Sequence, residues 1–118
     1  MKTILIAEDN DSNYILMTYI LKRSYQSLRA KNGEEAVALA DKGGIDLILM
    51  DMKMPVMGGL EATKIIKERH PELPIIALTA NAFDSDRQAA EEAGCSAFLP
   101  KPVSSEKCLA CIEDIIGK

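Results

Sequence analysis

The sequence has no long hydrophobic run, no excess of positive charge and no even set of cysteines. No apolar stretch among its 118 residues approaches the ~20 that span a bilayer. The short apolar run at residues 4–7 ends in acids, so we do not expect it to belong to a signal peptide. A net charge of −4 argues against direct binding to nucleic acid or to an anionic membrane. With Met1 taken as the start, we expect a cytoplasmic protein.

The three cysteines, Cys95, Cys108 and Cys111, are an odd number, which does not suit a secreted disulfide framework. Cys108 and Cys111 form a C-x-x-C pair within an amphipathic helical pattern. A zinc site would need a second pair of ligands. We therefore expect these cysteines to pack on one helix face.

Composition and patterning favour one α/β domain over residues 1–118. Hydrophobic residues make up 47% and charged residues 27%, as in soluble globular proteins, and no repeat or linker interrupts the chain. Short apolar runs alternate with helical patterns five times, which predicts a parallel sheet with helices on both faces. The predicted strands are 3–7, 27–30, 47–50, 75–78 and 97–99. The predicted helices begin near residues 11, 33, 59, 85 and 104.

Two of these elements carry more specific expectations. The second strand is short and mixed in polarity, which favours the edge of the sheet. The first helix is expected to begin at a cap formed by Ser12 or Asp11. Its apolar periodicity predicts a buried face made of Ile15, Leu16, Tyr19 and Ile20.

Polar and charged side chains follow four of the predicted strands. Glu8 and Asp9 come directly after the first strand, and Asp51 ends the third. Thr79 ends the fourth strand, and Lys101 follows the fifth. Because the carboxyl ends of parallel strands share one edge of a sheet, these side chains are expected to meet there.

The negative charges of three carboxylates at one edge of the sheet must be offset by positive charge. Two unit charges ~4 Å apart repel by about 4 kcal/mol at an effective dielectric constant near 20. A divalent cation with hard oxygen ligands removes this repulsion, and Mg²⁺ is favoured over Ca²⁺ because few protein oxygens are offered. Asp51, at the end of a buried strand, has the character of a carboxylate nucleophile for phosphoryl transfer. The Lys101 ammonium and the Thr79 hydroxyl can then contact two oxygens of the incoming phosphoryl group.

Four motifs resemble the receiver domains of two-component signalling in order along the chain. They are E-D-N at 8–10, D-M-K-M-P-V-M-G-G at 51–59, T-A-N-A at 79–82 and F-L-P-K-P at 98–102. The variants are most similar to receivers of hybrid sensor histidine kinases, so the chain is either such a receiver or a free single-domain regulator. The resemblance implies a CheY-like, doubly wound (βα)5 flavodoxin-like three-layer sandwich with sheet order 2-1-3-4-5.

The resemblance also implies roles for individual residues. Asp51 would accept a phosphoryl group from a histidine kinase or a histidine phosphotransfer domain. Mg²⁺, with Mn²⁺ as a substitute, would be held by Asp9, Asp51 and the backbone carbonyl of Lys53, with Glu8 acting through water. The backbone N–H of Ala80 would help to hold the phosphoryl group.

The remaining implied features concern switching and output. Phe98 would rotate inward as Thr79 moves toward the phosphoryl group, changing the surface of the fourth helix, fifth strand and fifth helix. Lys53 and Asn81 occupy positions that tune dephosphorylation, and the Lys101–Pro102 bond is usually cis. The resemblance implies a phosphorylated switch and not a turnover enzyme. It would either control a downstream protein or relay the phosphoryl group to a histidine phosphotransfer domain, as a monomer or a weak phosphorylation-linked dimer.

Two alternatives remain beside this interpretation. A phosphatase of the haloacid dehalogenase type also uses an aspartyl nucleophile, Mg²⁺ and a lysine, but carries a second acid where this chain has Lys53. A receiver that acts only as an unphosphorylated interaction module would have lost an acid, the acceptor or the lysine, and all of these are present.

Overall fold

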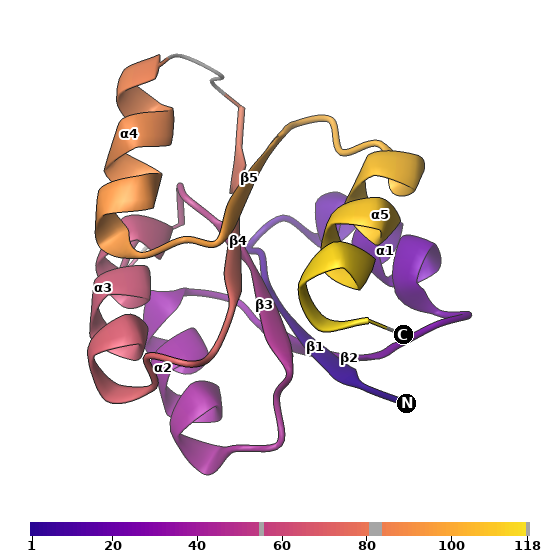
Figure 1. The fold of residues 1–118 in the computed structure, drawn as a ribbon, viewed down its shortest axis with the longest axis horizontal. Coiled ribbons are helices and arrows are strands. Elements are labelled where there is room, and N and C mark those ends of the chain that lie inside the picture. Colours follow the sequence, from indigo (N-terminus) through magenta and orange to yellow (C-terminus); the bar gives the residue numbers. More distant parts are fainter. Residues whose placement is uncertain (55, 81–83, 118) are drawn as a thin grey trace.

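The centre of the molecule is a parallel sheet of five strands in the order β2-β1-β3-β4-β5 (Figure 1). The structure, a computed structural model, describes residues 1–54, 56–80 and 84–117. The strands are β1 (Thr3–Ala7), β2 (Gln26–Ala30), β3 (Leu47–Asp51), β4 (Ile75–Thr79) and β5 (Ala97–Pro100). The predicted order is confirmed, and each strand lies within one residue of its predicted bounds.

Five helices cover the two faces of this sheet (Figure 1). Helices α1 (Asp11–Leu21) and α5 (Ser105–Ile116) lie on one face. The other face is covered by α2 (Gly33–Lys42), α3 (Gly59–Arg69) and α4 (Asp84–Ala93). The predicted three-layer, doubly wound sandwich is therefore confirmed. Within the described ranges, no helix has both the length and the apolar character needed to cross a membrane.

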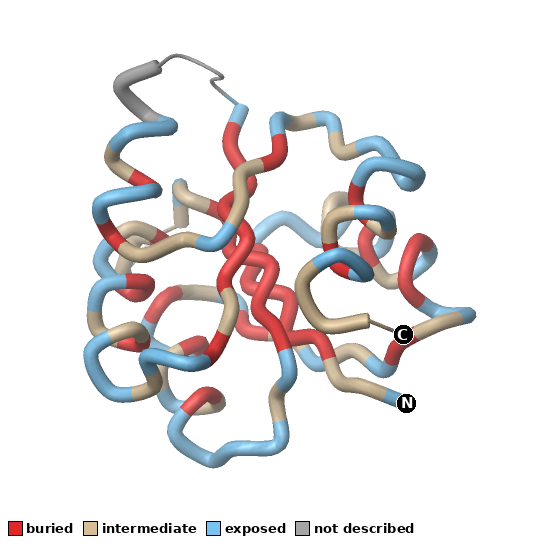
Figure 2. The backbone as a smooth tube through the Cα atoms, viewed as in Figure 1, coloured by how far each residue is buried: buried red, intermediate tan, exposed pale blue. Residues whose placement is uncertain are grey.

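The central strands are buried on both sides, which explains their uninterrupted apolar sequences. Figure 2 shows buried backbone concentrated along the sheet. Alternate residues of β1 belong to separate cores, with Ile4 and Ile6 packing in the core under α1 and α5. Leu5 packs in the core under α2 and α3. Strand β2 lies at the edge, as predicted, and Ala30 is its one buried residue.

Helix α1 corrects two predictions. Its N-cap is Asn10, whose side-chain oxygen accepts from the Asn13 N–H at 3.0 Å, and not Ser12 or Asp11. The predicted buried face was also wrong, apart from Ile20. The residues that α1 buries are Met17, Ile20 and Leu21, whereas those it leaves exposed include Ile15, Leu16 and Tyr19.

The C-x-x-C pair belongs to the packing of α5, as predicted. Cys108 is fully buried in the core beneath α1 and α5, and Cys111 packs against that core from a partly buried position. Burial raises the pKa of the Cys108 thiol to about 12. A thiol held neutral in this way is a packing group rather than a nucleophile.

Gly59 lets the start of α3 approach the end of β3. A Cβ atom at Gly59 would lie 2.0 Å from the Asp51 carbonyl oxygen. The preceding Gly58 has no such contact, because its Cβ would meet only the Met52 carbonyl oxygen at 3.5 Å. The absence of a side chain at Gly59 therefore permits the position of Asp51.

Replacing Gly59 with alanine should lower the free energy of unfolding by about 2–3 kcal/mol, because backbone atoms must move to admit the methyl group. Gly58→Ala is the matched control and should cost less than about 1 kcal/mol, through the weaker capping by alanine alone. Urea denaturation of both variants measures the difference. Equal losses in the two variants would show that the close approach at Gly59 is unimportant.

Candidate functional site

The predicted polar residues meet at the carboxyl edge of the sheet. Asp51 and Thr79 are the last residues of β3 and β4, and Glu8, Asp9 and Lys101 directly follow strand ends. They border one open cleft of about 220 Å³, whose lining is made of Glu8, Asp9, Asn10, Asn13, Asp51, Lys53, Thr79, Ala80 and Lys101. Parallel pairing of β1 with β3 and of β3 with β4 brings these strand ends together.

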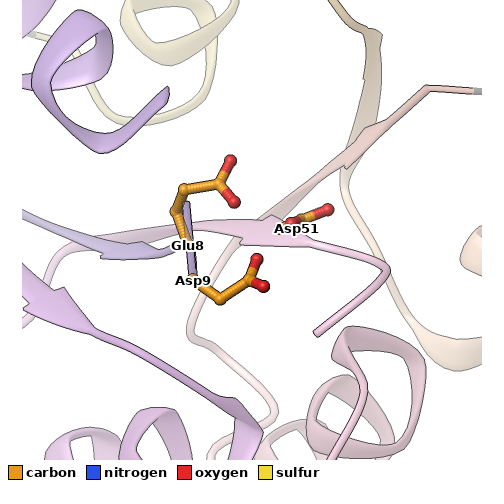
Figure 3. Close-up of side chains that lie close together, drawn as sticks. All are labelled: Glu8, Asp9 and Asp51. Atoms are coloured by element: carbon orange, nitrogen blue, oxygen red, sulfur yellow. The ribbon is translucent and has the colours of Figure 1, made fainter. Parts of the chain in front are cut away.

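Three carboxylates form the acidic part of the cleft. Glu8, Asp9 and Asp51 each offer an oxygen that lies within 4.8 Å of the others, and Figure 3 shows them at the neighbouring ends of β1 and β3. Glu8 is 1% exposed and Asp51 is 5% exposed, whereas Asp9 faces solvent. Because two of the three are buried, their repulsion is poorly screened by water.

Lys101 supplies a positive charge to the two buried acids. Its ammonium lies 2.9 Å from Glu8 Oε1 and 3.2 Å from Asp51 Oδ1. Burial opposes the charged form of Lys101, but the hydrogen bond to Glu8 and the charge of Asp51 outweigh it and raise the pKa of the ammonium. The lysine therefore stays protonated across the physiological range.

The environment of Glu8 disfavours the charged form of its carboxyl group. Burial is the largest influence, and together with the neighbouring Asp51 it raises the pKa of the Glu8 carboxyl despite the favourable contact with Lys101. The contact with the Lys101 ammonium therefore does not outweigh the combined effects of burial and of Asp51 on Glu8.

The donor set fits a small divalent cation. Among the described residues, these three acids are the group whose carboxylate oxygens lie close enough together to share an ion, and oxygen ligands suit Mg²⁺. Backbone N–H groups also orient the acids, since Lys53 N–H donates to Asp51 Oδ1 at 3.2 Å and Asn10 N–H to Glu8 Oε2 at 3.4 Å. Lys101 contacts both buried acids, and Asp9 is the acid of the three that faces solvent.

The structure separates some of the predicted residues from this cleft. Phe98 is partly buried in a different hollow beside α4, where the Arg87 guanidinium lies 5.7 Å from its ring. Asn81 lies outside the described residues. The Lys101–Pro102 bond is cis, in agreement with the resemblance.

Sequence reasoning missed Asn13 in the lining of the cleft. Asn13 lies in the first turn of α1, one turn from the Asn10 cap. The run of polar residues at 9–13 marked a helix start but did not indicate which of them would face the acids.

Comparison with known proteins gives a consistent result. The sequence profile of the response regulator receiver domain matches residues 4–113. The polar-differentiation response regulator DivK of Brucella anthropi is 38% identical over 121 residues, covering 98% of this chain and 97% of its own length.

Two solved structures resemble the chain in fold and sequence. The receiver domain of sensor histidine kinase PA1611 from Pseudomonas aeruginosa, with a magnesium ion coordinated in its active-site cleft, has a TM-score of 0.91 and 34% identity, with 99% of this chain and 98% of that one covered. The co-crystal structure of the Saccharomyces cerevisiae histidine phosphotransfer protein Ypd1 with the receiver domain of its downstream response regulator Ssk1 gives a TM-score of 0.92 and 32% identity, covering 98% and 88%.

The raised pKa of Glu8 gives a pH-dependent prediction for the metal-free protein. Folding raises the pKa of the Glu8 carboxyl above its ordinary value of 4.5. The contribution of such a group to the free energy of unfolding is fully present below pH 4.5, and it is lost as the pH rises through the pKa of the folded protein. Because glutamine does not titrate, the Glu8→Gln variant does not lose this contribution. Its free energy of unfolding should therefore rise relative to that of the parent protein as the pH increases from about 4.5 to 7.5. Urea denaturation in EDTA measures this gain.

Glu34→Gln, at an exposed position in the first turn of α2, is the matched control for replacement of a glutamate outside the cleft. The assignment of a raised pKa to Glu8 is wrong if Glu8→Gln and the parent protein have parallel pH profiles.

Proposed function

The chain belongs to the response regulator receiver domain family, and from that membership we propose that Asp51 is the residue that accepts the phosphoryl group. Receivers of this family act as phosphoacceptor switches in two-component signalling. The observation that carries the assignment to Asp51 is its place at the buried end of β3, between the Lys101 ammonium and the Asp9 carboxylate. Glu8 is also buried, contacts Lys101 and has two acidic neighbours. The choice of Asp51 over Glu8 therefore rests on its position as the last residue of β3, which is the acceptor position of the receiver motif that the chain resembles.

The proposed reaction is transfer from a phosphohistidine. A carboxylate oxygen of Asp51 forms a bond to phosphorus, while the phosphorus–nitrogen bond breaks and its electron pair leaves with the donor imidazole. When bound, Mg²⁺ supplies positive charge that offsets the charge of the phosphoryl oxygens. Asp9, Asp51 and the Lys53 carbonyl are the proposed ligands, with Glu8 acting through water, and Mn²⁺ is a proposed substitute.

Lys101 and Thr79 contact the phosphoryl group in this proposal and respond to its charge. A phosphoryl group adds about −1.5 to −2 charges to the cleft, so the Lys101 ammonium is drawn from Glu8 toward a phosphoryl oxygen. The Thr79 hydroxyl and the Ala80 N–H border the cleft and donate to further oxygens in this proposal. Phe98 lies on β5 next to α4, so displacement of the end of β4 is transmitted to the surface formed by α4, β5 and α5.

The phosphodonor is proposed to be a histidine phosphotransfer domain or a histidine kinase. Similarity to the receiver in the Ypd1–Ssk1 co-crystal structure supports this partner. We also propose that the domain acts in the cytoplasm, where kinases obtain ATP, and that it is a single receiver domain, monomeric or weakly dimeric when phosphorylated.

The exposed apolar side of α1 is the proposed docking surface for this donor. Ile15 and Tyr19 are 63% and 69% exposed, and Leu16 is 44% exposed. Leu16 also lines a small hollow whose other walls include Glu8 and Lys101. A protein that delivers a histidine to Asp51 therefore covers an apolar surface immediately beside the cleft, as interface cores do.

The two other activities are less well supported. In haloacid dehalogenase phosphatases the acid two residues beyond the nucleophile protonates the leaving group, and this chain has Lys53 there. An unphosphorylated interaction module has no need of the acids and lysine that meet in the cleft. The site supports a switch that is phosphorylated once and reset, and not a turnover phosphatase.

Incubation with Mg²⁺ and acetyl phosphate should add one phosphoryl group in a form that hydroxylamine removes, as expected for an acyl phosphate. Asp51→Asn should abolish the adduct, whereas Asp114→Asn, at an exposed position on α5, should retain it. Intact-protein mass spectrometry measures both. An adduct of unchanged yield in Asp51→Asn would overturn the assignment of the acceptor.

The α1 surface predicts a difference between protein and small-molecule donors. Leu16→Ser should slow transfer from a phosphorylated histidine phosphotransfer domain by about tenfold, since interface anchors contribute 1 kcal/mol or more, while leaving phosphorylation by acetyl phosphate unchanged. Leu28 has the same exposure, 45%, on edge strand β2. Leu28→Ser is the matched control, and an equal loss in both variants would contradict docking on α1.

A further inference from the structure

Arg29 lies where edge strand β2 faces the start of α1. It is paired in register with Ile6, whose side chain belongs to the core under α1 and α5. Its side chain is only 17% exposed. The guanidinium therefore lies beneath the segment that connects β1 to α1, which is the segment that carries Glu8 and Asp9.

The guanidinium contacts four groups of this connection and the following helix. Arg29 Nε and Nη2 donate to the Glu8 carbonyl at 3.3 and 3.2 Å. Nη2 also lies 3.4 Å from the Asp9 carbonyl and 2.8 Å from Asp11 Oδ1. The Tyr14 ring covers the guanidinium at 4.4 Å, and Asp11 and Tyr14 share one helix face because they are three residues apart.

These contacts fix the backbone on both sides of Asp9. The Glu8 N–H donates to the Ala30 carbonyl at 3.0 Å, so both backbone groups of Glu8 are held by the end of β2. The Glu8 and Asp9 carbonyls flank the Cα atom of Asp9. With both attached to one planar group, the direction in which the Asp9 side chain leaves the backbone is restricted.

We propose that Arg29 is a positioning residue that holds the Asp9 carboxylate in its metal-binding orientation. This inference rests on the proposed function, in which Asp9 and Asp51 share a Mg²⁺ ion. Arg29 is not a catalytic residue, because its contacts are to backbone carbonyls, to Asp11 and to Tyr14. It acts through the shape of the connection from β1 to α1.

Geometry and charge have opposite effects here, which makes the inference testable. The positive charge of Arg29 near the acidic cluster repels a cation, so charge alone would make its removal strengthen Mg²⁺ binding. Loss of the guanidinium hydrogen bonds to the Glu8 and Asp9 carbonyls would instead free the backbone at Asp9 and weaken Mg²⁺ binding. Lysine keeps the charge but lacks the planar fork and the five fixed donors of arginine.

The Asp11 contact is expected to contribute less than the carbonyl contacts. Asp11 is 82% exposed at its side chain, and an ion pair with such a partner is screened by water and salt. Asp11→Asn should therefore leave Mg²⁺ affinity close to that of the parent protein.

Isothermal titration of the unphosphorylated protein with Mg²⁺ tests the inference. Arg29→Lys should bind Mg²⁺ about tenfold more weakly, at the lower end of what outer contacts to a metal site contribute. Arg29→Gln should also bind more weakly than the parent protein, but by a smaller factor, because loss of the positive charge favours the cation. In phosphorylation by acetyl phosphate, both should need correspondingly more Mg²⁺ for half-maximal rate yet reach the parent rate at saturation. Unchanged or tighter binding in both variants overturns the inference.

Two controls separate this result from other causes. Arg69→Lys alters an arginine–aspartate pair between the C-terminal ends of α3 and α2, where Arg69 Nη1 lies 2.6 Å from Asp41 Oδ2, and should leave Mg²⁺ affinity unchanged. Thermal unfolding in EDTA establishes that each Arg29 variant is folded at the temperature of titration. If the parent protein itself fails to bind Mg²⁺, the proposed function fails; if only the Arg29 variants bind like the parent, the inference alone fails.

Discussion

The Lys101 ammonium holds together two carboxylates that the fold buries side by side, at 2.9 Å from Glu8 and 3.2 Å from Asp51. Two such charges ~4 Å apart repel by about 4 kcal/mol at an effective dielectric constant near 20, and Asp9 adds a third charge nearby. A single lysine cannot neutralise three carboxylates, and burial together with the neighbouring Asp51 raises the pKa of the Glu8 carboxyl despite the contact with Lys101. The remaining imbalance favours binding of a cation, and it makes Lys101 responsive to any new negative charge on Asp51.

The rest of the fold serves to place these charges. Strands β1 and β3 are neighbours at the centre of the sheet, so their carboxyl ends meet without any long connection. Gly59 admits the start of α3 against the Asp51 carbonyl. On the other side, Arg29 attaches the acidic connection to edge strand β2. The acidic residues are thus held by rigid neighbours, which is the arrangement that positioning of a reacting group requires.

The strands and the meeting of Asp51, Thr79 and Lys101 could be predicted because each depends on local patterns and on the direction of parallel strands. The order of the strands was implied by the resemblance to receiver domains and not by these patterns. The buried face of α1 could not, because apolar residues occur around most of that helix and its periodicity selects no single side. The cap of α1 was ambiguous for a similar reason, since residues 9–13 are all polar and several can cap. The contacts of Arg29 join segments about 20 residues apart and have no sequence signature.

A crystal structure of the protein with Mg²⁺ and beryllium trifluoride, which imitates a phosphoryl group, would show which acid is the acceptor. We expect beryllium bonded to a carboxylate oxygen of Asp51, Mg²⁺ contacted by Asp9 and Asp51, and the Lys101 ammonium moved from Glu8 to a fluoride. Beryllium on a different acid, or Lys101 still bridging Glu8 and Asp51 beside a bound fluoride complex, would contradict this expectation.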